Sequence, residues 1–186
     1  MKLTKVAVLV GSIRKESFSK KIALALKEEA PDSLQLDLID LNKLEMYNQD
    51  LDDEGKETEA WKEFRKTIKT YDAVLFVTPE YNRSVPALMK NAIDIGSRPY
   101  GKSVWDGKPG AVVSVSPGSM GGFGANHHLR QTLVFLNVPV MQQPEAYIAN
   151  VFTMFDPNGK LINDKTRGYL KSFMAEYASW VGKLLA

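Results

Sequence analysis

A turn rich in hydroxyl groups follows the apolar run Val6–Val10 and carries the side chains best suited to hold a phosphate. It reads Gly11-Ser12-Ile13-Arg14-Lys15-Glu16-Ser17-Phe18-Ser19. A helix that begins here presents unpaired backbone N–H groups and the positive end of its dipole, and the serine hydroxyls add donors beside them. Arg14 supplies a permanent cation. The segment therefore predicts a phosphate site, while the simpler interpretation is a turn in which Ser17 or Ser19 caps the helix.

The glycine content of this turn limits which nucleotide it could bind. A dinucleotide-binding loop carries the pattern G-x-G-x-x-G, and an NTPase loop ends in Gly-Lys followed by Ser or Thr. The turn after Val10 has one glycine and no Gly-Lys pair, so a tightly bound dinucleotide and ATP are both disfavoured. Separate hydroxyl donors and one arginine suit a terminal phosphate monoester such as that of FMN, because they can converge on a dianion from several sides.

Two further segments could complete a ligand site. Thr78–Pro86 is rich in hydrogen-bonding groups, and its prolines stiffen both ends so that backbone amides and the Asn82 side chain can meet a flat ring or its side chain. Ser116–Gly124 has four glycines among its last seven residues. Such a run lets the backbone approach a flat ligand closely, and its N–H groups can stabilise negative charge on that ligand.

Five runs have the pattern of strands. Three are short, apolar and bounded by turn residues, as buried parallel strands should be. A fourth alternates between apolar and polar residues, as a half-exposed edge strand does, and a fifth, which contains Pro139, fits the opposite edge. In that order the runs are Val6–Val10, Ala73–Val77, Ala111–Val115, Leu34–Leu38 and Val138–Met141.

Apolar residues at helical spacing fill the intervals between these runs. One helix is expected to open at Pro86 and to close at Gly96, and the last helix has an apolar strip wide enough to lie across one face of a sheet. Trp61, Phe173 and Trp180 are assigned to packing. The apolar faces are Ile22, Leu26 and Ala30; Trp61, Phe64, Ile68 and Tyr71; Leu88, Ala92 and Ile95; Leu129, Leu133 and Leu136; and Leu170, Phe173, Tyr177, Trp180, Val181 and Leu184.

This alternation predicts one domain, residues 1–186, with a flavodoxin-like α/β fold. The expected architecture is a three-layer sandwich, with a five-stranded parallel sheet in the order 2-1-3-4-5 and helices on both faces. Ligands of such sheets lie beyond the carboxyl ends of the strands, where the strand order reverses. The three loops are therefore expected to meet at one site.

Composition excludes several classes of function. The chain has 186 residues and no cysteine, so disulfides, thiolate metal sites and a cysteine nucleophile are absent, and any redox chemistry falls to a cofactor. A net charge of +2 is too small to predict nucleic acid as a partner. No apolar stretch is long enough to span a bilayer, and the first residues lack a signal-peptide pattern. We expect a cytoplasmic protein with no membrane partner.

Taken together, the three loops resemble those of the NADPH-dependent FMN reductase family, which includes chromate and quinone reductases and related azoreductases. The resemblance covers nearly the whole chain, and the first two motifs in this order are its most specific part. The motifs are Gly11-Ser12-x-Arg14-x-x-Ser17-x-Ser19; Pro79-Glu80-Tyr81-Asn82, followed by Ser84-Val85-Pro86 and Lys90-Asn91-Ala92-Ile93-Asp94; and the glycine-rich loop leading into His128-Leu129-Arg130-Gln131.

The resemblance implies which residues bind FMN. The phosphate would lie in the first loop, the ribityl chain and one ring edge against the second, and the pyrimidine side of the ring against the third. The implied cofactor-binding residues are Ser12, Arg14, Ser17, Phe18 and Ser19; Pro79, Glu80, Tyr81 and Asn82; and Ser116, Pro117, Gly118, Ser119, Met120 and Gly121. No metal and no catalytic side chain are implied, because the cofactor performs the hydride transfer.

The implied activity is a ping-pong transfer of hydride from NADPH or NADH through FMN to a small acceptor, which could be a quinone, an azo compound, a free flavin or a metal anion. The alternatives are a flavodoxin-type electron carrier and a flavin-free signalling or scaffold domain. Near-neutral charge and the arginine in the phosphate loop disfavour the carrier. Members of the family form homodimers and homotetramers, so interface contacts are a hypothesis for Arg83, His127, Arg130 and Glu145.

Several polar residues are expected to have no catalytic role. His127 and His128 are adjacent, so on a helix they point in different directions and cannot comfortably share one metal. Glu80 is not needed as a base for hydride transfer, whereas the Tyr81 ring could border the flavin or simply pack in its loop. Asn42–Glu59 is the one long irregular segment, with six acidic residues and one lysine in Asp50–Glu59, and it is expected to be a solvated acidic loop.

Overall fold

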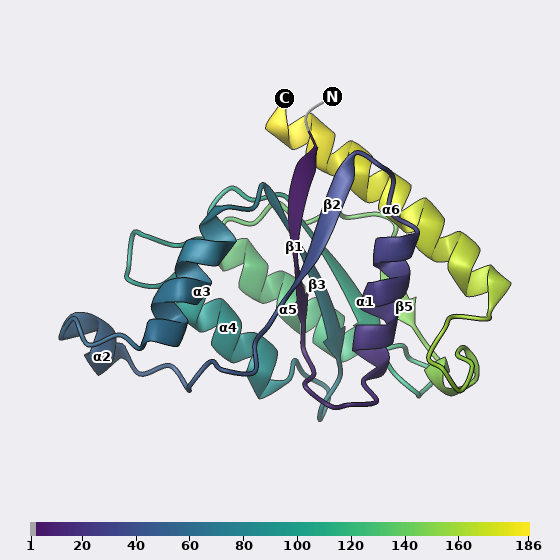
Figure 1. The fold of residues 1–186 in the computed structure, drawn as a ribbon, viewed down its shortest axis with the longest axis horizontal. Coiled ribbons are helices and arrows are strands. Elements are labelled where there is room, and N and C mark those ends of the chain that lie inside the picture. Colours follow the sequence, from purple (N-terminus) through teal and green to yellow (C-terminus); the bar gives the residue numbers. More distant parts are fainter. Residues whose placement is uncertain (1–2) are drawn as a thin grey trace.

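The computed structural model describes residues 3–186, and it has a five-stranded parallel sheet in the order β2-β1-β3-β4-β5 (Figure 1). The predicted flavodoxin-like order is thus confirmed. The strands are β1 (Thr4–Val10), β2 (Leu34–Ile39), β3 (Ala73–Pro79), β4 (Gly110–Val115) and β5 (Ala146–Ile148). The helices are α1 (Phe18–Glu28), α2 (Gln49–Asp53), α3 (Glu59–Lys69), α4 (Ala87–Ser97), α5 (Phe123–Phe135), the 3₁₀ turn η1 (Val151–Thr153) and α6 (Asp164–Leu185).

Helices cover both faces of the sheet, as the three-layer prediction requires (Figure 1). Alternate residues of β1 enter the two cores: Val6 and Val8 face α1 and α6, whereas Ala7 and Leu9 face α3, α4 and α5. All four are fully buried. A strand buried on both faces needs apolar residues at consecutive positions, and this explains the continuous apolar runs of β1, β3 and β4.

The aromatic residues assigned to packing do pack. Trp61 is 0% exposed in the core beneath α3, and Phe173 of α6 is buried in the opposite core. The Trp180 indole N–H donates to the Pro139 carbonyl at 3.0 Å. Tyr177, also on α6, donates its hydroxyl to the Val74 carbonyl at 2.7 Å, and burial raises the pKa of this phenol. Helix α6 is therefore attached to the sheet by polar contacts as well as by apolar area.

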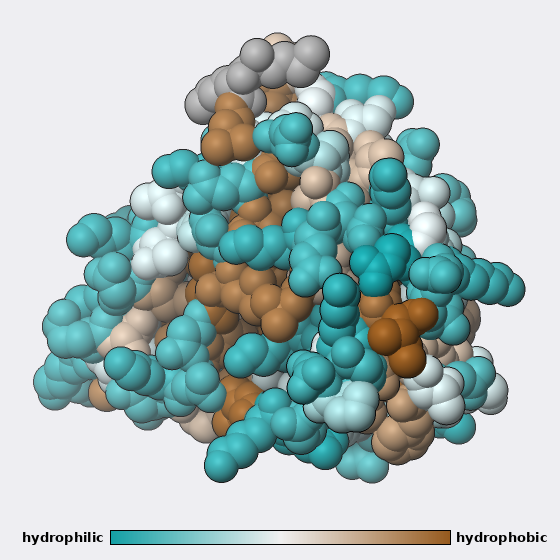
Figure 2. Space-filling view, turned by 45° about the vertical axis from the view of Figure 1, so that its right-hand side comes forward, coloured by the Kyte–Doolittle hydropathy of each residue, from teal (hydrophilic) through white to brown (hydrophobic). Residues whose placement is uncertain are grey.

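The β2 edge of the sheet is half exposed, as predicted from its alternation. Leu34 and Leu36 are buried, while Gln35 and Asp37 between them are partly exposed. Figure 2 shows a mostly hydrophilic face interrupted by a band of apolar atoms near β2. Charged side chains such as Asp37 on an edge strand disfavour pairing with another chain.

The predicted strand at the opposite edge is wrong in its position. Val138–Met141 contributes one isolated bridge, between Val140 and Gly110, while the edge strand is β5, Ala146–Ile148. Proline explains the displacement: Pro139 has no N–H to donate to a ladder, and a second proline, Pro144, follows before β5 begins. The chain therefore touches the amino end of β4 once and pairs again only at its carboxyl end.

Helix α4 was expected to close at Gly96, because glycine often follows the last turn of a helix. Gly96 instead lies inside the helix, which continues to Ser97. A Cβ atom at position 96 would lie 2.4–2.6 Å from atoms of the Trp105 indole. Trp105 is fully buried and donates its indole N–H to the Ile93 carbonyl at 2.9 Å. Glycine at this position therefore leaves room for the Trp105 ring and does not mark the end of the helix.

The acidic segment is not entirely solvated. Asn48 caps the short helix α2, and the Asp52 side chain within it is 2% exposed. Arg65 of α3 donates two hydrogen bonds to the Asp52 carboxylate, both at 2.7 Å. Burial is the largest single influence and disfavours the carboxylate, but the hydrogen bonds from Arg65 and Tyr47 and the charges of Arg65 and Arg98 together hold the pKa of Asp52 below its usual value. The prediction of a solvated loop is therefore wrong at Asp52, whose partner lies outside the segment.

Replacing Gly96 by alanine should destabilise the fold, because the new Cβ would overlap the Trp105 ring. Overpacking of this kind costs about 1–3 kcal/mol, and urea unfolding followed by tryptophan fluorescence measures it. Gly182→Ala is the matched control: Gly182 lies in α6, and a Cβ added there would meet nothing within 4 Å, so alanine should stabilise the helix by up to about 1 kcal/mol. Equal effects of the two substitutions would contradict the proposed packing.

Candidate active site

Three loops meet beyond the carboxyl ends of β1, β3 and β4, which are neighbours in the sheet. They enclose a cavity of about 220 Å³. All five predicted cofactor-binding residues of the first loop line it, together with three residues of the second loop and one of the third. The lining residues are Ser12, Arg14, Ser17, Phe18, Ser19, Pro79, Glu80, Tyr81, Val115, Pro117 and Phe152. The three loops thus converge, as expected at the point where strand order reverses.

The first loop presents its hydroxyl groups at the beginning of α1. Ser17 is the N-cap, and its hydroxyl accepts the Lys20 N–H at 3.1 Å. The Ser19 hydroxyl lies 3.0 Å from that of Ser17, and both residues are 2% exposed. The capping interpretation is therefore confirmed at Ser17. The cap places two hydroxyls and the positive end of a helix dipole against the same cavity, and phosphate binding there stays a prediction.

Gly11 lets the first loop lie directly against the end of β3. Its N–H donates to the Val77 carbonyl at 2.9 Å, so that the sheet ladder extends into the turn. A Cβ at this position would lie 3.1 Å from Pro79 Cδ and 3.2 Å from Thr78 Oγ1. Contacts this short leave little room for a larger residue, so the approach of the two loops depends on glycine.

The second loop folds as a tight turn at its tip. Tyr81 and Ser84 exchange two backbone hydrogen bonds of 3.0 Å. The two residues between them, Asn82 and Arg83, have positive φ angles of 50° and 64°. Asparagine tolerates this backbone region better than most residues, which explains its presence here. The turn leaves Asn82 exposed and outside the 220 Å³ cavity, while Tyr81, which is 52% exposed, stands at the edge of the cavity.

Glu80 is engaged in structure rather than free to act as a base. One of its oxygens accepts the backbone N–H of Ala125 at 3.0 Å, in the first turn of α5. A carboxylate at this end of a helix is stabilised by the helix dipole. A Cβ on Gly124 would meet the Arg83 carbonyl oxygen at 2.7 Å, so the second loop and the start of α5 are packed together.

The third loop wraps closely around the end of β5. Gly121 and Gly122 have φ angles of 59° and 78°, and a Cβ on Gly121 would meet backbone atoms of Tyr147 at 2.7–2.8 Å. The Ser116 hydroxyl accepts the Gly118 N–H at 3.1 Å, which tightens the beginning of the loop. Of this loop only Pro117 lines the 220 Å³ cavity. The other predicted residues, Ser116, Gly118, Ser119, Met120 and Gly121, lie along the loop beyond it.

A buried polar network holds the third loop from behind, and no sequence pattern predicted it. The Ser114 hydroxyl donates to the Gly121 carbonyl at 2.8 Å and lies 3.3 Å from the side-chain nitrogen of Asn126. Both side chains belong to residues that are 0% exposed. Arg130, expected at a subunit interface, donates to the Asn126 side-chain oxygen at 2.9 Å and to the Met141 carbonyl at 2.9 Å.

Two further lining residues were missed. Val115 is the last residue of β4, and Phe152 lies in η1, 67% exposed. The Phe152 ring meets the Phe18 ring edge to face, with centroids 5.2 Å apart. Phe152 brings a segment after β5 to the first loop, and the sequence carries no local signal for such a contact because the two residues are far apart in the chain.

The two histidines have different partners, in agreement with their expected divergence. His127 Nε2 lies 2.8 Å from the Tyr147 hydroxyl, and His128 Nδ1 lies 2.8 Å from the Ser84 hydroxyl. Burial, followed by the neighbouring Glu145 carboxylate, raises the pKa of Tyr147 to about 12. Within residues 3–186, no group of three or more His, Cys, Asp or Glu side chains is placed to hold a metal. No helix in that range is long and apolar enough to cross a bilayer.

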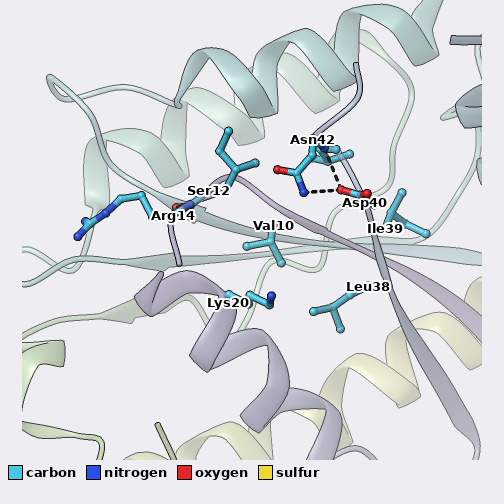
Figure 3. A pocket seen from close by; sticks show the side chains of 10 residues that line it. Val10, Ser12, Arg14, Lys20, Leu38, Ile39, Asp40 and Asn42 are labelled. Atoms are coloured by element: carbon cyan, nitrogen blue, oxygen red, sulfur yellow. Dashed lines mark hydrogen bonds between the residues drawn. The ribbon is translucent and has the colours of Figure 1, made fainter. Parts of the chain in front are cut away.

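A second cavity, of about 290 Å³, adjoins the first loop on the side of β2 (Figure 3). Ser12 and Arg14 line both cavities. The second cavity is otherwise bounded by residues at the ends of β1 and β2 and by Lys20 of α1. No residue of the second or third loop reaches it.

The fold and the 220 Å³ cavity together define an α/β protein with a hydroxyl-lined cavity at the switch point of a flavodoxin-like sheet. The family model described as NADPH-dependent FMN reductase matches residues 4–153. The chain belongs to this family, and it is therefore an oxidoreductase.

Named relatives agree with that assignment. The chain is 61% identical over 176 residues to a "Quinone reductase" of Pseudomonas putida, covering 95% of this chain and 94% of the relative. It is 45% identical over 177 residues to a "2-hydroxy-1,4-benzoquinone reductase" of Burkholderia sp, covering 95% and 96%. Among solved structures, FerB, a flavoenzyme NAD(P)H:(acceptor) oxidoreductase from Paracoccus denitrificans, aligns with a TM-score of 0.89 at 38% identity, over 97% of this chain and 98% of that one.

Substituting Ser114 by alanine should loosen the third loop specifically. The change leaves the Gly121 carbonyl without its buried donor, at a cost of about 1–3 kcal/mol. Hydrogen exchange should then become faster at the amides of residues 118–121 while the amides of the first loop keep their rates. Ser172→Ala is the control, because this exposed hydroxyl bonds only within α6 and its loss should change stability by less than about 0.5 kcal/mol. Equal acceleration in both loops would argue against a specific support.

Proposed function

We propose that this chain is an NAD(P)H-dependent quinone reductase whose residues 1–186 form one FMN-binding domain. The observation that carries the proposal is the 220 Å³ cavity, in which two buried serine hydroxyls, the start of α1 and Arg14 converge. Buried hydroxyls at a helix N-terminus beside a cation are complementary to a phosphate dianion. The names of the Pseudomonas putida and Burkholderia relatives support a quinone as the acceptor.

The residues present fit FMN in chemistry and in arrangement. Ser12, Arg14, Ser17 and Ser19 would hold its phosphate, with Phe18 covering the site. Pro79, Glu80 and Tyr81 border the same cavity, where the ribityl chain would lie, and Asn82 stands at the adjoining turn. When bound, FMN would accept a hydride from the nicotinamide and deliver two electrons to the acceptor in a second half-reaction.

The part of the protein in this chemistry is binding and orientation. The second loop, with two prolines and a hydrogen-bonded turn, provides a rigid wall that fixes the ring plane. In the third loop the N–H groups of Gly118 and Gly121 bond within the loop, so the backbone N–H groups of Ser119 and Met120 would be the donors offered to the ring. The Ser114 bond to the Gly121 carbonyl keeps this carbonyl turned toward the interior. Donors fixed in this way stabilise negative charge that develops on a flat ligand without reorganising. The hydride transfer itself needs no side-chain base, and the proton that completes the reduction of a quinone to a hydroquinone would come from water.

We extend the proposal to the acceptors, the reductants, the oligomeric state and the location of the protein. The acceptors would be quinones first, with azo compounds, free flavins and metal anions such as chromate as further candidates, and NADH and NADPH would both serve as reductants. We also propose a homodimer or homotetramer in the cytoplasm. Exposed apolar side chains on α5 support self-association: Val134 is 77% exposed and Phe135 is 79% exposed.

Replacing Arg14 by alanine should weaken FMN binding by about tenfold or more, since it removes a charge-assisted bond to the phosphate. Riboflavin, which lacks the phosphate, should bind the variant and the wild type equally. Fluorescence titration of the apoprotein with both flavins measures the two affinities. Lys15→Ala is the control in the same loop, because Lys15 does not line the cavity. Equal losses for both flavins would contradict a phosphate contact at Arg14.

The activity itself is tested by anaerobic titration of the FMN-loaded protein. NADPH or NADH should bleach the visible flavin absorption, and a stoichiometric amount of benzoquinone should restore it. Initial rates at several quinone concentrations should give parallel double-reciprocal lines, as a ping-pong cycle requires. Flavin that stays oxidised with either reductant would instead indicate an electron carrier, and a protein that binds no flavin would contradict the proposal.

A further inference from the structure

The 290 Å³ cavity beside β2 has the composition of a nucleoside site. Its inner surface is apolar, with Val10, Leu38 and Leu41 buried or half-buried. Its rim is polar and exposed, with Lys20 and Asp40 among its members. Figure 3 shows Lys20 on one side of Val10 and Asp40 with Asn42 on the other. A flat heterocycle could lie on such a floor while hydroxyl and phosphate groups meet the rim.

The Asp40 carboxylate is held in place by Asn42, which bonds one of its two oxygens. Its Oδ1 accepts the Asn42 backbone N–H at 2.9 Å and the Asn42 side-chain N–H at 2.6 Å. These two bonds lower the pKa of Asp40, so the group stays ionised at neutral pH. Both bonds use Oδ1, and among residues 3–186 the structure gives Oδ2 no hydrogen bond. An ionised oxygen of this kind can accept from a ligand hydroxyl.

The position of Asp40 in the fold indicates which ligand group its Oδ2 atom would bind. Asp40 directly follows β2, which pairs with β1, so it lies beside the first loop at the ligand-binding edge of the sheet. In dinucleotide-binding α/β sheets, an acidic residue near the end of the second strand hydrogen-bonds the adenosine ribose, and the pyrophosphate lies at the N-terminus of the helix that follows the first strand. Lys20, in the first turn of α1, lines this cavity and is placed to meet such a pyrophosphate. Arg14 lines both this cavity and the 220 Å³ cavity.

We infer that this cavity binds the adenosine end of the reduced nicotinamide dinucleotide, with Asp40 contacting the ribose and Lys20 the pyrophosphate. The inference rests on the proposed function, since it concerns the co-substrate of that reaction. A volume of about 290 Å³ is at the lower limit of the about 300–1,000 Å³ typical of ligand pockets, so it suits a nucleoside and not a whole dinucleotide. The pyrophosphate would pass Arg14, and the nicotinamide would extend to the flavin.

The test compares reductants with and without adenosine. Lys20→Ala should raise the KM for NADH about fivefold, with kcat unchanged, and should leave the KM for dihydronicotinamide riboside unaltered because this reductant carries no adenosine or pyrophosphate. Lys27→Ala is the matched control, an exposed lysine on the same helix that lines neither cavity. Calorimetric titration of the FMN-loaded protein with ADP gives a readout independent of activity, and ADP should bind Lys20→Ala about fivefold more weakly than Lys27→Ala.

A second variant tests the ribose contact. Asp40→Asn keeps an oxygen for both Asn42 bonds, so the turn should persist. It removes the charge that repels a 2′-phosphate, and it should therefore raise the ratio of kcat/KM for NADPH to that for NADH at least about fivefold. The ratio should not change in Lys27→Ala.

Each remaining outcome has a distinct meaning. If the wild type oxidises NADH and the riboside with equal efficiency and the variants change neither, the adenosine site is wrong while the reductase function stands. If Lys20→Ala impairs both reductants equally, Lys20 acts on the nicotinamide or on the fold, and the inference is again wrong. A wild-type protein that holds FMN and oxidises none of the three reductants would overturn the proposed function, and the adenosine site with it.

Discussion

The candidate site depends on the close approach of the Gly11 turn to the end of β3. The backbone bond from Gly11 to the Val77 carbonyl continues the ladder between β1 and β3 by one residue, so the loop leaves the sheet directly above its neighbour. A side chain at position 11 would crowd Pro79 and Thr78. Because the two loops touch, the serine hydroxyls of one and the proline and tyrosine of the other face a single cavity.

The second requirement is a rigid support behind loops that have little regular structure. Glu80 of the second loop accepts a hydrogen bond from the first turn of α5. In the third loop the Gly121 carbonyl accepts one from the buried Ser114 hydroxyl, so each loop is attached to a helical or buried element. Buried polar groups are costly unless they are hydrogen-bonded, and once bonded they restrict the backbone to one arrangement. Glycine-rich backbone can thus lie next to a ligand without losing its shape.

Much of the fold and of the first loop could be predicted from local sequence. The continuous apolar runs of β1, β3 and β4 reflect burial on both faces, and the alternation of β2 reflects an edge, because both patterns arise within a few residues. The helix cap could be narrowed to Ser17 or Ser19 for the same reason, and the structure shows that it is Ser17. The position of the last strand was predicted less well, because proline interrupts strand pairing in that part of the chain. The edge strand β5 lies after Pro144 and not around Pro139.

Contacts between distant residues could not be predicted in this way. Glycine often marks the end of a helix, yet Gly96 lies inside α4 and leaves room for Trp105. Asp52 belongs to an acidic stretch, yet its side chain is buried in an ion pair with Arg65. Phe152 reaches Phe18 only because β5 and η1 return the chain to the first loop. The sequence by itself determined the alternation of buried strands and helices, the hydroxyl-rich turn and the type of ligand it suits, since these depend on neighbours along the chain. Only the tertiary structure decided which side chains enclose the site and which support it, because those depend on the distance between atoms that the chain separates by tens of residues.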